Sequence, residues 1–153
     1  MYTADAIDLR ILALLQEDGK MTNKEVAGRL GLTVTPVYER IRRLEREGFI
    51  RQYAALLSKE KLGLEVLAFC NVSLREHSRP LIKQFEQEVL LLKEVLACWH
   101  IGGGFDYLLK VVVEDMESYQ TFIVDKLAAL DNIGQVQSSF VLTEVKNSTA
   151  YPL

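Results

Sequence analysis

The residues of this chain best suited to chemistry are four arginines within seven positions, namely Arg40, Arg42, Arg43 and Arg46. A guanidinium group binds two oxygens of a phosphate, or the O6 and N7 atoms of a guanine, in a fixed planar geometry. Apolar residues recur between them at helical spacing, at Val37, Ile41 and Leu44. This pattern predicts a helix with an apolar inner face and an arginine-rich outer face. Such a helix fits the major groove of DNA. Because glutamates are interspersed among the arginines, an ordinary solvated face is the alternative interpretation.

The residues in front of this helix favour DNA binding. Gly31 is expected to end a preceding helix in a left-handed conformation, and Thr33 to cap the next helix through its hydroxyl. Pro36 then lies in the first turn, where its missing N–H costs nothing. Two helices joined by so short a turn form a helix-turn-helix, in which the second helix reads the base pairs.

Each residue of this candidate DNA site has an expected role. Arg42 is predicted to bind guanine and Glu39 cytosine, with Thr35 and Tyr38 beside them on base edges. Arg40, Arg43 and Arg51 are predicted to hold phosphates, together with backbone N–H groups at the helix starts. Two alternatives stay open, because Tyr38 can pack on a neighbouring helix and Glu39 can pair with an arginine one turn away. The full predicted DNA-binding set is Asn23, Lys24, Thr33, Thr35, Pro36, Tyr38, Glu39, Arg40, Arg42, Arg43 and Arg51.

A second candidate site is the glycine-rich segment that ends in Asp106 and Tyr107. Glycines let the backbone approach a small molecule closely and present N–H donors to a carboxylate. Asp106 is placed to bind an ammonium group, so the segment would clamp a zwitterion, and two serines of the last strand are candidate hydroxyl contributors. The predicted ligand-binding set is Gly102, Gly103, Gly104, Phe105, Asp106, Tyr107, Ser138 and Ser139. The alternative is an ordinary β-turn. A phosphate loop is excluded because no Gly-Lys-Ser/Thr follows.

Hydrophobic periodicity predicts the elements that position these residues. A first helix is expected over Ala4–Gln16, a second beginning at a Thr22 or Asn23 cap, and a third reaching Gly48. The segment Phe49–Leu56 is β-compatible and is expected to pair as a small wing. We therefore expect a DNA-binding domain over residues 1–50, a linker or wing strand over 51–63, and a second domain over 64–153.

The second domain has the predicted order β-α-β-β-α-β, which is the ferredoxin-like arrangement of an antiparallel sheet with both helices on one face. Its strands are too apolar for a sheet whose other face meets water, so a second subunit is expected to cover that face. The six expected elements are Leu64–Leu74, Pro80–Leu92, Val95–Ile101, Asp106–Val113, Met116–Leu130 and Gly134–Val145.

Bulk composition narrows the class of protein. The chain has 153 residues, 49% of them hydrophobic, and a net charge of −3. Residues 1–60 hold ten Lys+Arg against nine Asp+Glu and the remainder eight against twelve, so an acidic body follows a near-neutral head with a basic stripe. Cys70 and Cys98 are expected to be free thiols in a reducing compartment. With no signal peptide and no membrane-spanning run, the protein is expected to be cytoplasmic. We find no catalytic constellation and predict no enzyme activity, cofactor or metal site.

Over essentially its whole length the sequence resembles the Lrp/AsnC (feast/famine) family of transcriptional regulators. The head segments IDLRILALLQEDGK and LGLTVTPVYERIRRLEREGFI resemble the family's opening and recognition helices. In the body, GGGFDYLLKVVVEDMESY and SSFVLTEVK resemble its glycine-turn-aspartate segment and last strand. The resemblance implies an α+β protein with an N-terminal winged helix-turn-helix and a C-terminal ferredoxin-like ligand-sensing (RAM) domain. It also implies dimers that assemble further, commonly into octamers, and an amino-acid effector.

These observations predict a sequence-specific regulator that binds double-stranded DNA and responds to a small effector. The first alternative is an architectural DNA-binding protein with the same assembly, in which residues 102–107 serve only as a turn. The second is a metabolic binding module or enzyme subunit that uses the ferredoxin-like body and has lost DNA binding.

Overall fold

The computed structural model describes residues 2–153, which form two compact units. The N-terminal unit comprises the residues up to Leu56 together with Lys146–Leu153, and the C-terminal unit is Leu57–Val145. Within the N-terminal unit, the amide of Gln16 holds the tail by two bonds to the backbone of Tyr151, at 2.7 and 3.2 Å. The predicted domain limits at residues 50 and 63 lie on either side of this division, and no pattern in the sequence indicates that the tail joins the first unit.

The N-terminal unit is built from three helices, α1 (Ala6–Glu17), α2 (Asn23–Leu30) and α3 (Val34–Arg46). Their inward faces bury the core residues Ile11, Val26, Ala27, Val37, Ile41 and Leu44. A capping box begins α2, since the Thr22 hydroxyl accepts from the Glu25 N–H and the Glu25 carboxylate accepts from the Thr22 N–H. Gly31 ends α2 at a φ of 67°. The predicted helix-turn-helix is therefore confirmed.

Two local expectations for this unit are wrong. Thr33 occupies the N-cap of α3, but its hydroxyl makes no capping hydrogen bond. An N-cap side chain bonds the N–H of the second or third helical residue, and the third is Pro36, which has none. The wing strand expected over 49–56 is not formed either. Residues 49–56 form neither helix nor strand, and the Ile50 N–H bonds the Leu44 carbonyl at 3.2 Å. Within residues 2–153 the first strand begins only at Val66.

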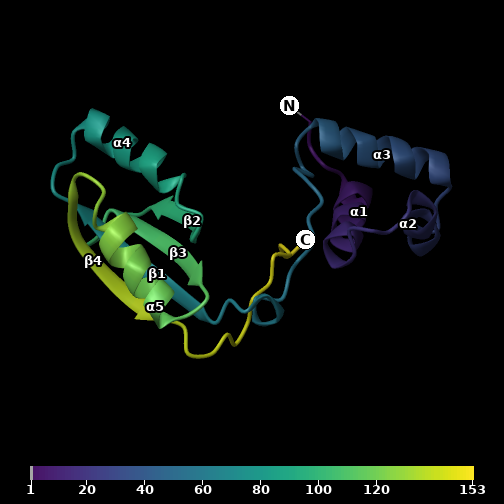
Figure 1. The fold of residues 1–153 in the computed structure, drawn as a ribbon. Coiled ribbons are helices and arrows are strands. Elements are labelled where there is room, and N and C mark those ends of the chain that lie inside the picture. The colour runs from purple at the N-terminus through teal and green to yellow at the C-terminus, as the bar shows by residue number, and fades with distance from the viewer. Residues whose placement is uncertain (1) are drawn as a thin grey trace. The chain divides into compact units, whose positions relative to one another are not determined.

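The C-terminal unit is a four-stranded antiparallel sheet with helices α4 and α5 on one face (Figure 1). The strand order is β2-β3-β1-β4, which confirms the ferredoxin-like arrangement. Helix α5 continues as a π-helical turn, and β4 ends five residues before the predicted Val145. The elements are η1 (Glu60–Leu62), β1 (Val66–Leu74), α4 (Arg79–Val89), β2 (Val95–His100), β3 (Tyr107–Val113), α5 (Met116–Thr121), η2 (Phe122–Leu127) and β4 (Ile133–Phe140).

The two faces of this sheet differ in what covers them. The helices cover the face that carries Cys70, Val72, Leu109 and Val111, all fully buried against Phe85 and Phe122. Strand alternation turns another apolar set to the opposite face, namely Leu67, Phe69, Trp99, Leu108 and Val112. We call these five residues the open sheet face. Trp99 on it is 46% exposed and Phe69 and Leu108 are half-buried, whereas Leu67 and Val112 are already buried within the chain.

Candidate functional site

The exposed face of α3 collects most of the residues predicted to read DNA. Thr35, Pro36, Tyr38 and Glu39 are all exposed, and the Arg42 side chain is 66% exposed. They lie opposite the buried stripe that anchors the helix, so packing holds the backbone while the side chains face outward. Among residues 2–153 no ion pair reaches Glu39, so the alternative pairing with Arg42 or Arg43 is not formed.

A hollow of about 250 Å³ lies beside this face, within the N-terminal unit. It brings Asn23 of α2 next to Tyr38 and Arg42 of α3, and its remaining lining residues are Leu15, Gly19, Met21, Ile41, Glu45 and Tyr53. Arg42 Nη1 lies 3.4 Å from Glu45 Oε2, and the Tyr53 hydroxyl donates to Glu45 Oε1 at 3.2 Å. An exposed ion pair this long is worth well under about 1 kcal/mol, so Arg42 remains free to leave Glu45 for a base.

Arg40 and Arg43 face a different way from Arg42. Arg40 Nη1 donates to Asp5 Oδ2 at 2.7 Å and to Asp8 Oδ1 at 2.8 Å. Arg43 Nη2 lies 3.6 Å from Asp8 Oδ1, and its guanidinium carbon lies 4.4 Å from the centre of the Tyr2 ring. Both guanidinium groups therefore point toward the start of α1, whereas the sequence predicts that they contact DNA phosphates. Lys24, Thr33 and Arg51, the other members of the predicted set, are exposed.

Asp8, which the sequence does not single out, is the buried charged residue that contacts these arginines. Its side chain is fully buried, although it lies in the first turn of α1, where an acidic residue usually faces solvent and interacts with the helix dipole. The signal was present in the spacing, because Asp8 lies three and seven residues before Ile11 and Leu15, on the apolar face of α1. A carboxylate on a buried face needs a cationic partner, and α3 supplies Arg40.

The predicted ligand segment forms the turn between β2 and β3. The Ile101 N–H bonds the Asp106 carbonyl at 2.8 Å and closes the turn, and Gly103 adopts a φ of 137°. Asp106 Oδ2 accepts from the Leu74 N–H at 2.7 Å, and Asp106 Oδ1 lies 2.8 Å from His77 Nε2. The bond from the Leu74 backbone, helped by His77, lowers the pKa of the Asp106 carboxyl. Asp106 thus stays ionised and ties the turn to the end of β1.

The remaining predicted ligand residues do not all join this segment. Phe105 is half-buried, but Tyr107 points into the core, where its hydroxyl donates to Glu86 Oε1 at 3.0 Å. Ser138 lies on the helix-covered face and accepts a 2.5 Å hydrogen bond from the Tyr119 hydroxyl. Its neighbour Ser139 faces the other side of the sheet, and β1 separates both serines from β3. Within one chain, therefore, the two serines do not face a single site with Asp106.

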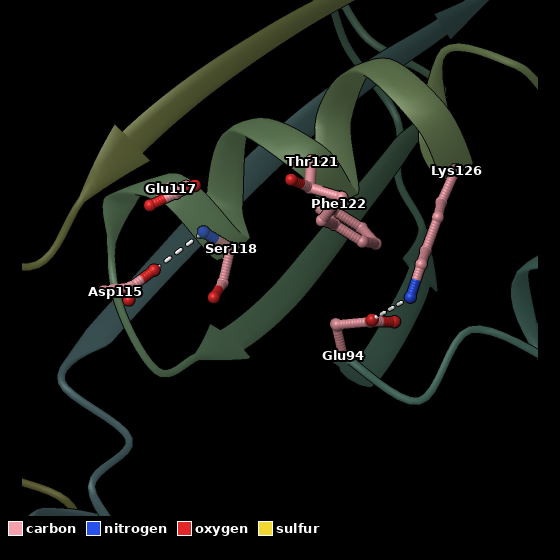
Figure 2. A pocket seen from close by; sticks show the side chains of 7 residues that line it. All are labelled: Glu94, Asp115, Glu117, Ser118, Thr121, Phe122 and Lys126. Atoms are coloured by element: carbon pink, nitrogen blue, oxygen red, sulfur yellow. Dashed lines mark hydrogen bonds and ion pairs between the residues drawn. The ribbon is translucent and has the colours of Figure 1, made fainter.

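A larger hollow, of about 470 Å³, lies along α5 and contains none of the predicted site residues (Figure 2). It is lined by Glu94, Asp115, Glu117, Ser118, Thr121, Phe122 and Lys126. Asp115 Oδ1 accepts the Ser118 N–H at 2.7 Å as the cap of α5, and Lys126 pairs with Glu94. Glu94, Asp115 and Lys126 are thus engaged by the fold itself. The part of the chain that the structure describes holds no cluster of three metal-ligating side chains, and none of its helices is long and apolar enough to cross a bilayer.

Two protein-family models match the chain. The model described as a winged helix-turn-helix DNA-binding domain matches residues 5–51. The model described as the Lrp/AsnC ligand binding domain matches residues 67–151. The first match therefore contains the whole of α3, and the second contains all four strands except Val66, with the turn at Asp106.

Similar proteins of known identity cover nearly the whole chain. The leucine-responsive regulatory protein of Escherichia coli K12 is 40% identical over 144 residues, 94% of this chain and 88% of that protein. The Bkd operon transcriptional regulator of Pseudomonas aeruginosa is 35% identical over 153 residues, covering 100% of both chains. Among solved structures, a transcriptional regulator from Neisseria meningitidis in complex with L-Met superposes with a TM-score of 0.94 at 40% identity, covering 98% of this chain and 97% of that one.

Proposed function

The chain belongs to the Lrp/AsnC family of transcriptional regulators, and from this membership we propose how its two units combine sequence-specific DNA binding with a response to an amino acid. The observation that carries the proposal is the outward face of α3, where exposed polar side chains stand on a helix fixed by its buried stripe. Such a face enters the major groove, with its N-terminal residues on base edges.

We assign base reading to Tyr38, Glu39 and Arg42, with Thr35 beside them at the start of α3. Arg42 is suited to guanine because its guanidinium is held only by the long contact to Glu45. Lys24 and Arg51 are assigned to phosphates, since both are exposed. Asn23, Thr33 and Pro36 lie at the starts of α2 and α3, beside the same face. The backbone N–H groups at these helix starts are assigned to DNA phosphates.

The effector is assigned to the turn that Asp106 anchors. The exposed glycines offer backbone N–H groups for a carboxylate, and the ionised Asp106 side chain offers a partner for an ammonium group. The similar regulator from Neisseria meningitidis was solved with L-Met, an amino acid with both groups. A free amino acid is therefore the class of effector that this chain is proposed to bind.

We propose that a second copy of the chain covers the open sheet face. Phe69, Trp99 and Leu108 keep accessible apolar surface on that face, and a twofold dimer would bury it on both copies. Dimerisation also presents two α3 helices to the two halves of a DNA site, which adds contact area that one unit lacks. Larger rings, up to the octamer that the family resemblance implies, would be built from such dimers.

A gel mobility shift tests the function directly. The probe is the duplex upstream of the protein's own gene, with an equally long scrambled duplex as competitor, in the presence and absence of each of the twenty amino acids. We expect a retarded complex that resists the scrambled competitor and that changes in amount or mobility with at least one amino acid. Equal competition by both duplexes would contradict sequence-specific regulation.

The ligand-independent architectural protein is the second candidate function, and one observation favours it. Both oxygens of Asp106 already have partners, Leu74 and His77, so the turn is complete without a ligand. In this case DNA binding is retained and calorimetry with all twenty amino acids gives no heat. A saturable heat with any of them favours the amino-acid-responsive regulator instead.

Replacing Asp106 with asparagine is expected to weaken amino-acid binding by about 10- to 100-fold, because a hydrogen bond to a charged group contributes about 1.5–3 kcal/mol. The asparagine oxygen can still accept the Leu74 N–H, so the turn persists. Titration calorimetry on the full chain measures the change. The matched control is Asp131→Asn, which makes the same charge change at an exposed position of the same unit. Wild-type affinity in Asp106→Asn would remove the carboxylate from the proposed site.

A further inference from the structure

A buried carboxylate joins α1 to the DNA-facing helix of the N-terminal unit. Asp8 has no exposed surface, and both of its oxygens are engaged. Oδ1 accepts from Arg40 Nη1 at 2.8 Å and lies 3.6 Å from Arg43 Nη2. Oδ2 accepts the hydroxyl of Tyr2 and, at 3.1 Å, the N–H of Asp5. We call Tyr2, Asp5, Asp8, Arg40 and Arg43 the Asp8 cluster.

The charges of this cluster balance within it. Two carboxylates, Asp5 and Asp8, meet two guanidinium groups, and Arg40 bonds both carboxylates. A buried carboxylate is strongly unfavourable without such partners, and an arginine that left the cluster would leave Asp8 uncompensated. Burial raises the pKa of the Asp8 carboxyl, but the bonds from Tyr2, Arg40 and the Asp5 backbone outweigh burial and lower it overall. The carboxylate therefore stays charged and keeps its hold on both arginines at neutral pH.

The cluster divides the arginines of α3 into two groups. The Arg40 and Arg43 side chains are 23% and 35% exposed and point at α1, whereas those of Arg42 and Arg46 are 66% and 71% exposed. Successive helical residues are about 100° apart, so Arg42 leaves α3 on nearly the opposite side from Arg40. A contact that holds Arg40 against α1 therefore keeps Arg42 directed away from α1.

We propose that Asp8 is a positioning residue for DNA recognition, which withdraws Arg40 and Arg43 from the phosphates and leaves Arg42 as the base-reading arginine of α3. The proposal rests on the proposed function of the α3 face. Phosphate contacts strengthen binding to every sequence, whereas base contacts discriminate between sequences. Two arginines held away from the backbone therefore lower nonspecific affinity and leave the base contacts to set specificity.

The experiment measures the salt dependence of DNA binding by the full chain carrying Asp8→Asn. Fluorescence anisotropy is recorded on the duplex upstream of the gene and on a scrambled duplex, at a series of salt concentrations. The freed arginines are expected to make phosphate contacts, each adding about 0.9 to the slope of log affinity against log salt. We expect several-fold tighter binding to the scrambled duplex and a preference for the specific duplex reduced about tenfold or more.

The matched control is Asp18→Asn, which changes the net charge equally at an exposed position of the same unit. Asp18 accepts the Lys20 N–H at 2.8 Å, and an asparagine oxygen can accept it too. The control is expected to keep the wild-type slope and preference. An equal change in Asp8→Asn and Asp18→Asn would overturn the proposal, because net charge would then explain both.

A second variant keeps the test decisive if Asp8→Asn does not fold, as circular dichroism would reveal. Arg43→Gln leaves the Arg40–Asp8 bond in place, and its salt slope is expected to equal that of the wild type. A slope reduced by about 0.9 would show that Arg43 holds a phosphate and would overturn the proposal. If the wild type binds neither duplex, the proposed function itself fails. If the wild type binds specifically and the folded Asp8→Asn variant keeps the wild-type slope and preference, only the role of Asp8 is overturned.

Discussion

Replacing Arg42 with glutamine is expected to lower affinity for the specific duplex by about 5- to 150-fold per DNA half-site, with little effect on a scrambled duplex. A bidentate arginine–guanine contact is worth about 1–3 kcal/mol of discrimination against the wrong base. Arg42 is the exposed arginine nearest the middle of α3, and it shares a hollow with Asn23 and Tyr38 of the same face. Anisotropy titrations on both duplexes at one salt concentration separate the loss of specificity from a general loss of charge.

Arg46→Gln is the matched control for this prediction. Arg46 is the last residue of α3, its side chain is 71% exposed, and its Nε lies 3.5 Å from Glu47 Oε1. Recognition helices contact bases mainly through their N-terminal residues, so Arg46 is expected to affect both duplexes equally and weakly. The opposite result, with specificity lost in Arg46→Gln and kept in Arg42→Gln, would show that the helix enters the groove by its other end.

The elements predictable from the sequence are those with long, regular patterns. The stripe of Val37, Ile41 and Leu44 predicts α3 because a helix repeats every 3.6 residues, and all three are buried. Likewise the alternation through Cys70 and Val72 predicts β1. Gly31 predicts the end of α2 because the position needs a left-handed backbone, which it has.

Details that depend on a partner in space were not predictable. The wing over 49–56 needs a second strand to pair with, and a β-compatible composition does not supply one. The direction of Arg40 depends on Asp8, which lies 32 residues earlier in the chain. The sequence predicts Ser138 and Ser139 together as hydroxyl contributors from the last strand, yet adjacent strand residues face opposite sides of the sheet. The candidate DNA face could therefore be predicted largely from the sequence of α3 alone. The role of each arginine on it depends on how α3 packs against α1.

Replacing Leu108 with glutamate is expected to convert the assembled protein to monomers, with a dimer dissociation constant raised at least about 100-fold. Leu108 lies on the central strand β3, with Asn71 of β1 and Trp99 of β2 as its register partners. If water covers the open sheet face, a glutamate there costs the chain little. If a second copy covers it, each dimer must bury two added carboxylates, which costs several kcal/mol.

Sedimentation velocity measures the assembly state of the Leu108→Glu variant, and the single tryptophan of the chain reports on the same face. Trp99 is 46% exposed in the isolated chain, so its fluorescence is expected to shift to the red when the monomer forms. The control is Leu90→Glu, at the C-terminal cap of α4, where the wild-type leucine is 80% exposed. In the proposed dimer two α3 helices bind one DNA site, so monomeric Leu108→Glu is also expected to lose affinity for the specific duplex while α3 is unchanged. A variant that sediments as the wild type does would place the contact between copies on another surface and remove the link between the sheet and DNA affinity.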